Sequence, residues 1–422
     1  MQPGNPPSLL ANADLLQEAL QWSRLGELLA RWRELPLYRT RLERRKEPVR
    51  ESVARLPYIT KREMREGFPH NFLPADAVLA ALLERREVEL EYTSGTSEES
   101  TPVLFRHGWW DEQERRVLRL NPFIARVLDE TPEARRATIT SPACNGRACP
   151  VVWQSPAQRT FGRTLFVNLA RIPFSLGDNE LQRMADEIRD WAPQFLDLSP
   201  VHGARFALYC EQHGLRFPSL RFILASYEFV SVTHRRILER VFGVPVFNLY
   251  GSTETGHLLM EDAPGEMKSS HENAILEVVE PDARGVGDLV ATTLTNEYMP
   301  LLRYRIGDLV ERSEQPHRTS WRVHGRVRDA LRGRDGRRIT TWEADQCFAG
   351  TPGIAHYQLA QSLNGTLRLR YLPDTVGPTT LELKDLADRI NTLLQPPTPV
   401  EIEAVPLLLP AHSGKFRLTC PA

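Results

Sequence analysis

The chain has 422 residues, of which 53 are lysine or arginine and 54 are aspartate or glutamate, and its formal net charge is -1. This length suggests two domains, and the near-zero charge gives no general attraction to nucleic acid. The polar, proline-rich start lacks the pattern of a secretory signal, and no stretch has the apolar length of a membrane span. The 5 cysteines are scattered and odd in number, which favours free thiols. We therefore expect a cytoplasmic protein with no membrane partner.

The first elements alternate between helix and strand. Apolar residues repeat at helical spacing over residues 13–35, which predicts an amphipathic helix. Thr60 is followed three residues later by Glu63, a capping-box pattern that predicts a short helix. Further along, short apolar runs alternate with helical segments, which predicts an α/β fold with a mostly parallel sheet flanked by helices. The strands are expected at residues 137–140, 163–168, 222–225 and 246–249, and the helices at residues 181–191 and 234–242.

The last third of the chain changes character. Residues 286–296 are apolar and β-branched, which predicts a buried strand. Asp308 follows Gly307 and is expected at a strand end, a common position for an acid that binds the two hydroxyls of a ribose. From about residue 328, a Gly- and Arg-rich turn precedes a small α+β module. Its elements are expected as a strand at residues 367–372, a helix at 381–394 and a strand at 400–405.

Two motifs carry groups suited to a nucleotide. Residues 92–102 are rich in Ser, Thr and Gly, and their hydroxyl and backbone N–H groups can cradle a polyphosphate, although most such clusters are ordinary turns. At residues 250–254 the sequence reads Tyr-Gly-Ser-Thr-Glu after an apolar strand. There the Tyr250 ring can stack on adenine, the Thr253 hydroxyl can donate to a phosphate, and the Glu254 carboxylate can bind Mg²⁺. A strand leading into a polar turn is the alternative reading.

These segments, in this order, resemble those of the adenylate-forming enzymes, most closely the phenylacetate:CoA ligase branch. The resemblance extends from about residue 56 to residue 417 and is most specific in its middle third. It implies a large N-terminal domain, residues 1–327, that binds ATP and the acyl substrate, and a small mobile C-terminal α+β lid domain, residues 328–422. The matching runs are residues 92–102, 226–228, 250–254, 286–309, 325–329 and 413–417.

The resemblance also implies roles for individual residues. Lys415, Thr253 and Glu254 would be catalytic, with Glu254 holding Mg²⁺ through ATP, and Asp329 would be the hinge. Asn145 and Gly146 fall where relatives line the acyl pocket, although a plain turn explains them about as well. The residues expected to contact the nucleotide are Ser94, Gly95, Thr96, Ser226, Tyr227, Glu228, Tyr250, Gly251, Ser252, Asp308 and Arg326.

The chain departs from the family pattern at two places. Glu98 and Glu99 follow Ser97 where the family usually continues Gly-Lys-Pro, which alters how pyrophosphate is held. Residues 313–321 lack the cysteines with which many relatives bind structural zinc, so we expect no zinc.

The activity implied is the ATP-dependent conversion of a carboxylic acid, by analogy an aromatic one, to an acyl adenylate, with Mg²⁺ as cofactor and CoA as acceptor. Two alternatives stay open. The acyl group could pass to a carrier-protein thiol or an amine in a biosynthetic pathway, or the protein could bind a nucleotide or acyl ligand without turnover. A homodimer is also a common outcome for such enzymes.

Overall fold

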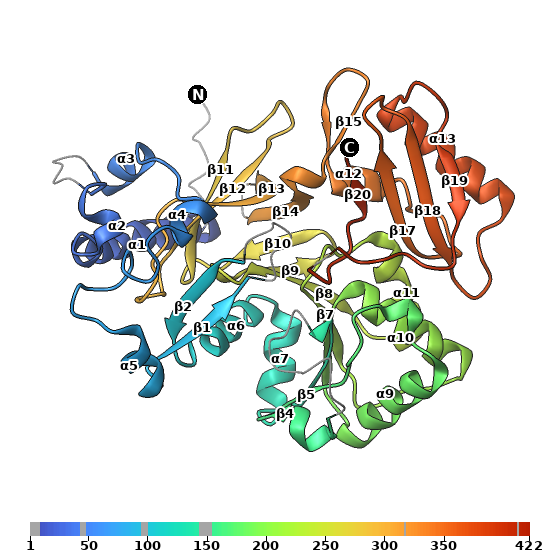
Figure 1. The fold of residues 1–422 in the computed structure, drawn as a ribbon, viewed down its shortest axis with the longest axis horizontal. Coiled ribbons are helices and arrows are strands. Elements are labelled where there is room, and N and C mark those ends of the chain that lie inside the picture. The colour runs from blue at the N-terminus through green and yellow to red at the C-terminus, as the bar shows by residue number, and fades with distance from the viewer. Residues whose placement is uncertain (1–8, 43–47, 94–99, 143–153, 316–317, 412) are drawn as a thin grey trace. The chain divides into compact units, whose positions relative to one another are not determined.

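A computed structural model describes residues 9–42, 48–93, 100–142, 154–315, 318–411 and 413–422 (Figure 1). The chain divides into two compact units, each made from two stretches of sequence. Unit 1 comprises Met1–Pro122 and Tyr250–Val323, and unit 2 comprises Phe123–Leu249 and His324–Ala422. Among the described residues, every helix is too short or too polar to cross a membrane.

The helices of unit 1 include both of those predicted. The amphipathic helix is α1 (Leu9–Trp32), and its later turns are buried in the apolar core of the unit, whereas Leu16 and Leu20 are exposed. The helix after Thr60 is α4 (Lys61–Arg65), and both halves of its capping box form. The other helices are α2 (Pro36–Arg39), α3 (Val49–Ala54), α5 (Leu79–Glu84) and α6 (Trp109–Leu118).

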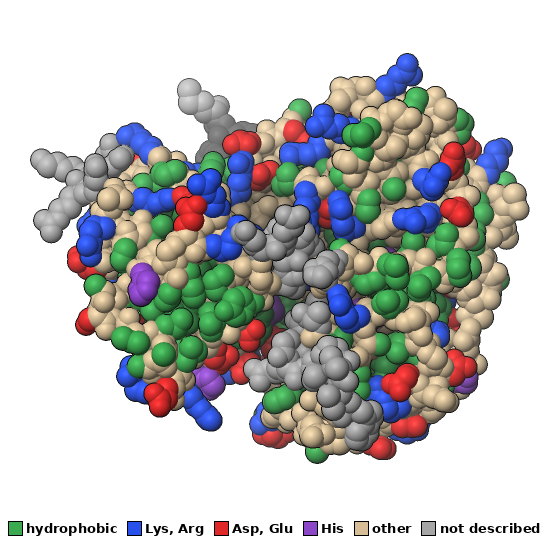
Figure 2. All heavy atoms as spheres, in the orientation of Figure 1, with side chains coloured by type: hydrophobic (Ala, Val, Ile, Leu, Met, Phe, Trp, Pro, Cys, Tyr) green, Lys and Arg blue, Asp and Glu red, His purple; other side chains and the backbone are tan. Residues whose placement is uncertain are grey.

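Antiparallel strand pairs make up the sheets of unit 1, and several of these pairs are successive in the chain, as antiparallel pairing allows. A hairpin pairs β1 (Val88–Tyr92) with β2 (Pro102–Arg106), and Figure 2 shows hydrophobic side chains gathered over it. A larger sheet has the order β11-β12-β13-β14-β10-β9, and the buried strand predicted over residues 286–296 is its β12. Its strands are β9 (Gly256–Ala263), β10 (Glu266–Ser269), β11 (Ala274–Val279), β12 (Val286–Thr293), β13 (Tyr304–Gln315) and β14 (Arg318–Arg326).

Unit 2 contains the predicted parallel sheet, which confirms the α/β class. Its order is β8-β7-β6-β3-β5-β4, parallel from β8 to β5, with β4 antiparallel at the edge. The strands are β3 (Arg136–Ile139), β4 (Thr160–Phe161), β5 (Thr164–Phe166), β6 (Phe195–Leu198), β7 (Phe222–Ala225) and β8 (Val246–Ser252). Buried apolar side chains from α9 (Asp178–Trp191), α10 (Pro200–Gln212) and α11 (Val232–Phe242) pack on this sheet. A shorter helix, α7 (Pro122–Glu130), precedes β3.

The C-terminal part of unit 2 is a second sheet with the order β19-β18-β17-β20, packed against α13. The predicted elements of this module are confirmed as β18 (Leu367–Pro373), α13 (Thr380–Leu394) and β19 (Glu401–Ala404). The boundary predicted between residues 327 and 328 falls inside the 3-10 turn η3 (Val327–Asp329), and the division into domains stays a prediction. The remaining elements are β15 (Leu331–Arg332), β16 (Arg338–Ile339), α12 (Thr341–Gln346), β17 (Ile354–Gln361) and β20 (Thr419–Cys420).

Candidate active site

The candidate phosphate loop connects β1 to β2 in unit 1. Its predicted ligands Ser94, Gly95 and Thr96 lie outside the described residues. The base of the loop is described: the backbone N–H of Thr93 donates to the carbonyl of Thr101 at 3.0 Å, and the N–H of Thr101 donates to Thr93 Oγ1 at 3.0 Å. These reciprocal bonds hold together the two strands from which the loop projects.

The tyrosine motif and Asp308 come together in unit 1. Tyr250 Oη donates a hydrogen bond to Asp308 Oδ2 at 2.6 Å, and Asp308 is only 5% exposed. Asp308 lies inside β13, so the prediction that it sits at a strand end was wrong. The register with β12 shifts between Asp288 and Val290, and Gly307 has a φ of +90°. Such an irregularity changes the direction of the neighbouring Asp308 side chain, as β-bulges do beside functional sites. A glycine in the sequence does not by itself predict a bulge inside a strand.

The turn after Tyr250 is tightly packed. A Cβ on Gly251 would lie 2.4 Å from the carbonyl oxygen of Gly256, so no larger residue fits there without moving the backbone. The hydroxyls of Ser252 and Thr255 lie 2.9 Å apart and stabilise the turn. Thr253, between them in the sequence, is half-buried. Thr253 therefore lies within a closely packed turn, and part of its side chain is accessible.

Glu254 is a buried carboxylate held in its ionised form. It is 4% exposed, and its Oε1 lies 2.9 Å from the Lys61 ammonium and accepts a hydrogen bond from Tyr304 Oη at 2.9 Å. Burial acts to raise the pKa of Glu254, but the charge and hydrogen bond of Lys61, with the bond from Tyr304, hold that pKa below its ordinary value. An ionised carboxylate at this position can bind a cation.

Ser226 and Tyr227 lie in unit 2, just after β7. Both donate to one carboxylate on the neighbouring strand β6: Ser226 Oγ lies 2.6 Å from Asp197 Oδ1, and Tyr227 Oη lies 2.8 Å from Asp197 Oδ2. Tyr227 has a φ of 70°, a conformation that non-glycine residues seldom adopt. The segment is therefore held in a strained, defined shape at the carboxyl end of the parallel sheet, where α/β proteins bind ligands.

Glu228, the next residue, connects this segment to the loop that carries Lys415. Its Oε2 accepts from Ser199 Oγ at 2.7 Å, and its Oε1 accepts from the backbone N–H of Phe416 at 2.7 Å. Burial raises the pKa of the Glu228 carboxyl, and the bonds from Ser199 and Phe416, with the charge of Lys415, offset only part of that rise. The structure thus brings together two predicted site residues, Glu228 and Lys415.

The predicted hinge residue is also tied to this loop. Arg417 Nε donates to Asp329 Oδ1 at 2.7 Å. Burial raises the pKa of Asp329, in spite of the positive charges of Arg417, Arg328 and Arg326. Arg326, at the end of β14, is therefore near Asp329 within unit 2, whereas Asp308 belongs to unit 1.

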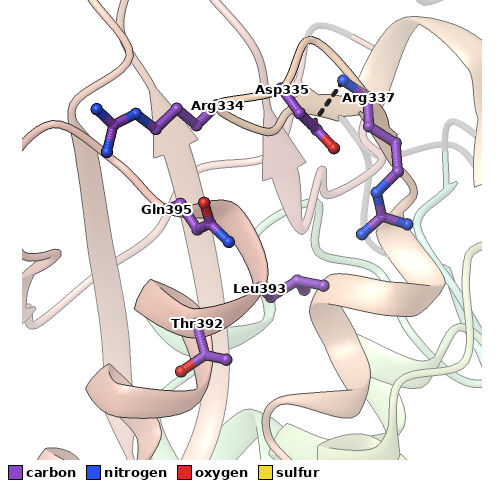
Figure 3. A pocket seen from close by; sticks show the side chains of 6 residues that line it. All are labelled: Arg334, Asp335, Arg337, Thr392, Leu393 and Gln395. Atoms are coloured by element: carbon purple, nitrogen blue, oxygen red, sulfur yellow. Dashed lines mark hydrogen bonds between the residues drawn. The ribbon is translucent and has the colours of Figure 1, made fainter.

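The predicted acyl-pocket residues, Asn145 and Gly146, lie outside the described residues. A surface hollow of about 310 Å³ in unit 2, shown in Figure 3, is lined by residues of the β15–β16 turn and the end of α13. In it, Asp335 Oδ1 accepts from the backbone N–H of Arg337 at 2.9 Å. Its lining contains none of the predicted site residues. The hollow is lined by Arg334, Asp335, Arg337, Thr392, Leu393 and Gln395.

Sequence reasoning missed the partners that hold the predicted residues in place. Lys61 and Tyr304 on Glu254, Asp197 on Ser226, and Arg417 on Asp329 were not predicted. For Lys61 a signal existed, because residues 56–66 resemble the lead-in of the phenylacetate:CoA ligase family as well as a capped helix start, but Lys61 itself was assigned no role in the site. For Asp197 the available signal was a single acidic residue in an otherwise apolar, buried strand, which indicates a side chain with polar partners.

Comparisons with known proteins were made for the whole chain. No protein-family model matches the chain. It is 25% identical over 374 residues to a phenylacetate-coenzyme A ligase of Thermus thermophilus, covering 83% of this chain and 79% of the relative. A phenylacetate-coenzyme A ligase of Pseudomonas putida is 25% identical over 360 residues, which are 77% of this chain and 74% of the relative.

A crystal structure of 2-hydroxyisobutyryl-CoA ligase in the postadenylation state shares the fold. It has a TM-score of 0.64 and 18% identity, and the match covers 90% of this chain and 85% of that chain. The chain is thus similar in sequence to phenylacetate-coenzyme A ligases and in fold to another CoA ligase. The two sequence relatives confirm the predicted resemblance to the phenylacetate:CoA ligase branch of the adenylate-forming enzymes. The likeness concerns the ligase as a whole, so the roles of its individual residues stay predictions.

Proposed function

We propose that this protein is an acid–thiol ligase that activates a carboxylic acid with ATP and passes the acyl group to CoA. In the first step, a carboxylate oxygen attacks the α-phosphorus of ATP, the bond from that phosphorus to the bridging oxygen breaks, and pyrophosphate leaves. In the second step, the CoA thiolate attacks the acyl carbon, and AMP leaves with the electron pair of the C–O bond. The thiol proton passes to solvent.

The observation that carries this proposal is the direct contact between Tyr250 and Asp308. The two residues come from separate motifs, each matched to nucleotide binding, and their side chains lie 2.6 Å apart. We assign the Asp308 carboxylate to the ribose hydroxyls and the Tyr250 ring to the adenine face. The hydrogen bond fixes the two side chains relative to each other, so a nucleotide that meets one would meet the other in a defined geometry.

Glu254 fits a magnesium ion that binds together with ATP. It is buried, and Lys61 keeps it ionised. The described residues contain no group of three or more His, Cys, Asp or Glu side chains that could hold a metal, so ATP phosphates and water would supply the ligands other than Glu254. The bound ion would neutralise phosphate charge. We assign Thr253 to the α-phosphate, with Gly251 and Ser252 shaping the turn and Ser94, Gly95 and Thr96 contacting the outer phosphates.

In unit 2, Lys415 would stabilise the negative charge that develops as the acid approaches the α-phosphorus. Glu228 holds the loop that carries Lys415 by accepting the N–H of Phe416. We assign Ser226 and Tyr227 to the adenine, and Arg326 to the ribose. Residues 328–422 would form a lid that rotates about Asp329 between the two steps, because one arrangement cannot place both Lys415 and CoA at the reacting group.

We expect an aromatic substrate, with CoA as acceptor, because both sequence relatives are phenylacetate-coenzyme A ligases. The test is pyrophosphate release by the full chain with MgATP and a panel of aryl, hydroxyaryl, aminoaryl and fatty acids, first without an acceptor. CoA, a carrier-protein thiol and simple amines are then added in parallel. Acid-dependent release that CoA accelerates is the expected result. Pyrophosphate release that only a carrier-protein thiol or an amine accelerates would replace CoA as the acceptor. No pyrophosphate release with any acid, in a protein that still binds ATP, would overturn the proposed activity.

A further inference from the structure

Helix α4 directs two cationic side chains to one side. Its start is fixed, because the N–H of Thr60 donates to Glu63 Oε2 at 2.9 Å, the N–H of Glu63 lies 3.5 Å from Thr60 Oγ1, and Arg41 forms an ion pair with Glu63. Lys61 and Arg65 are four residues apart in this helix, so they lie on the same face. The face carries two positive charges within one turn.

Lys61 reaches the carboxylate assigned to the metal. Its ammonium lies 2.9 Å from Glu254 Oε1, yet the Lys61 side chain is still 31% exposed, whereas that of Glu254 is 5% exposed. An ammonium has three N–H donors, and one bond to Glu254 leaves others to meet a second anion. The Lys61 ammonium thus contacts the buried carboxylate of Glu254 while part of the lysine side chain is accessible to solvent.

Arg65 reaches the base of the candidate phosphate loop. Its Nη1 donates to Thr101 Oγ1 at 3.2 Å, and Thr101 is bonded to Thr93 across the hairpin. A guanidinium presents its N–H groups in a planar fork that matches the oxygens of a phosphate. The two cations of α4 therefore lie at two parts of the proposed nucleotide site that sequence motifs had marked separately, the Glu254 turn and the root of the loop.

The candidate phosphate loop between β1 and β2 has an acidic sequence where relatives usually have a basic one. Residues 97–99 read Ser-Glu-Glu, so where relatives usually carry a lysine this chain has two acids. Most of the negative charge of ATP lies on its β- and γ-phosphates, and charge-assisted hydrogen bonds are the strong means of holding them. We propose that Lys61 and Arg65 bind the β- and γ-phosphates of ATP and replace the missing cation of the loop. This inference rests on the proposed function.

The test compares the binding of two nucleotides that differ only in these phosphates. MgATP and AMP are titrated calorimetrically into the full chain without an acid substrate, using Lys61→Met, Arg65→Met and the control Arg62→Met. Arg62 belongs to the same helix, but its side chain is 80% exposed and pairs with Glu66. We expect Lys61→Met and Arg65→Met each to weaken ATP binding roughly tenfold or more while leaving AMP binding within about twofold. The control should change neither.

The outcomes separate this inference from the activity on which it rests. Unchanged ATP affinity in both variants, or an equal loss for ATP and AMP, would overturn the role of α4 and leave the ligase assignment standing. A wild-type chain that binds neither nucleotide would overturn the proposed function itself. Lys61→Arg, which keeps the charge, should recover most of the affinity for ATP.

A folding defect would not obscure the result. Lys61→Met could be unstable because Glu254 loses its partner. In that case Glu254→Gln is compared with the double variant Lys61→Met/Glu254→Gln, since neither protein contains a buried unpaired charge at position 254. The double variant should bind ATP roughly tenfold more weakly than Glu254→Gln alone, with equal affinity for AMP. Equal affinities for ATP would overturn the proposal.

Discussion

Glu254 in unit 1 and Glu228 in unit 2 are both withdrawn from solvent, yet their pKa values move in opposite directions. Glu254 touches a cation, because Lys61 Nζ lies 2.9 Å from its oxygen. Glu228 instead touches neutral donors, a serine hydroxyl and the backbone N–H of Phe416. Neutral hydrogen bonds therefore do not offset the loss of hydration at Glu228, whereas a cation in contact more than offsets it at Glu254.

The two carboxyls consequently affect stability with opposite signs. At Glu254 the folded pKa is below the ordinary value of 4.5, so its stabilising effect is present above pH 4.5 and is lost as the pH falls through the folded pKa. At Glu228 the folded pKa is above 4.5. The folded state then holds the proton more tightly, and the free energy of unfolding falls as the pH rises from 4.5 through the folded pKa.

The largest expected effect follows from removing the cation near Glu228. Lys415→Ala should lower adenylate formation by roughly 10² or more while ATP binding stays largely intact, because the ammonium is needed only as charge develops in the transition state. Pyrophosphate release and an ATP titration measure the two quantities. Lys384→Ala, at an exposed position on α13, is the control. Adenylation at the wild-type rate would disprove the assigned role of Lys415.

Removing the cation that touches Glu254 should act on stability instead. Lys61→Met should lower the free energy of unfolding at pH 7 by about 2 kcal/mol, less than for a fully buried pair because the lysine side chain is partly exposed. The deficit should shrink as the pH falls, because the buried Glu254 of the variant takes up a proton more readily than Glu254 of the wild type, whose pKa Lys61 holds below 4.5. Urea unfolding at pH 7 and pH 4 measures it.

The chain offers a matched control for that experiment. Lys268 Nζ lies 2.9 Å from Asp262 Oδ2 in the same unit, at the same distance as the Lys61 pair, but the acid side chain is 19% exposed rather than 5% exposed. Lys268→Met should therefore have a much smaller effect. Equal losses for the two variants would show that burial of the carboxylate does not decide the outcome.

Removing the neutral donor from Glu254 separates the two kinds of contact. Tyr304→Phe deletes the hydroxyl 2.9 Å from Glu254 Oε1 and leaves Lys61 in place. We expect a loss of about 1 kcal/mol in the free energy of unfolding, the usual size for one hydrogen bond, with the pH dependence of the wild type preserved. A loss as large as that of Lys61→Met would mean that neutral donors matter as much as the cation.

The smallest effect is expected at Glu228. Glu228→Gln removes the titrating group, so the decline in the free energy of unfolding above pH 4.5 should become shallower than in the wild type. Chemical unfolding at several pH values between 4 and 8 measures the slope. Glu403→Gln, an exposed position on β19, should leave it unchanged. An identical slope for Glu228→Gln and the wild type would contradict the raised pKa.

Local patterns predicted those parts of the fold that depend on neighbouring residues. The cap at Thr60 and the apolar run that became β7 were both confirmed. The antiparallel sheet of unit 1 was missed, because strand pairing depends on contacts across the sheet rather than on the period of one strand. In the site, residue types identified Tyr250, Glu254 and Asp308 as candidates, but the ion pair of Lys61 with Glu254 joins distant segments, and no local pattern predicts it.

Phe416 and Arg417, the two residues after Lys415, anchor the loop that carries this lysine. Phe416 donates its N–H to Glu228 and packs its ring against His356, and Arg417 pairs with Asp329. Because these anchors are consecutive in the chain, the proposed displacement of Lys415 would break them together rather than one after another. Withdrawal of the lysine between the two proposed steps would then be a single activated event, and the time that the lysine stays in place would depend on the combined strength of all three contacts.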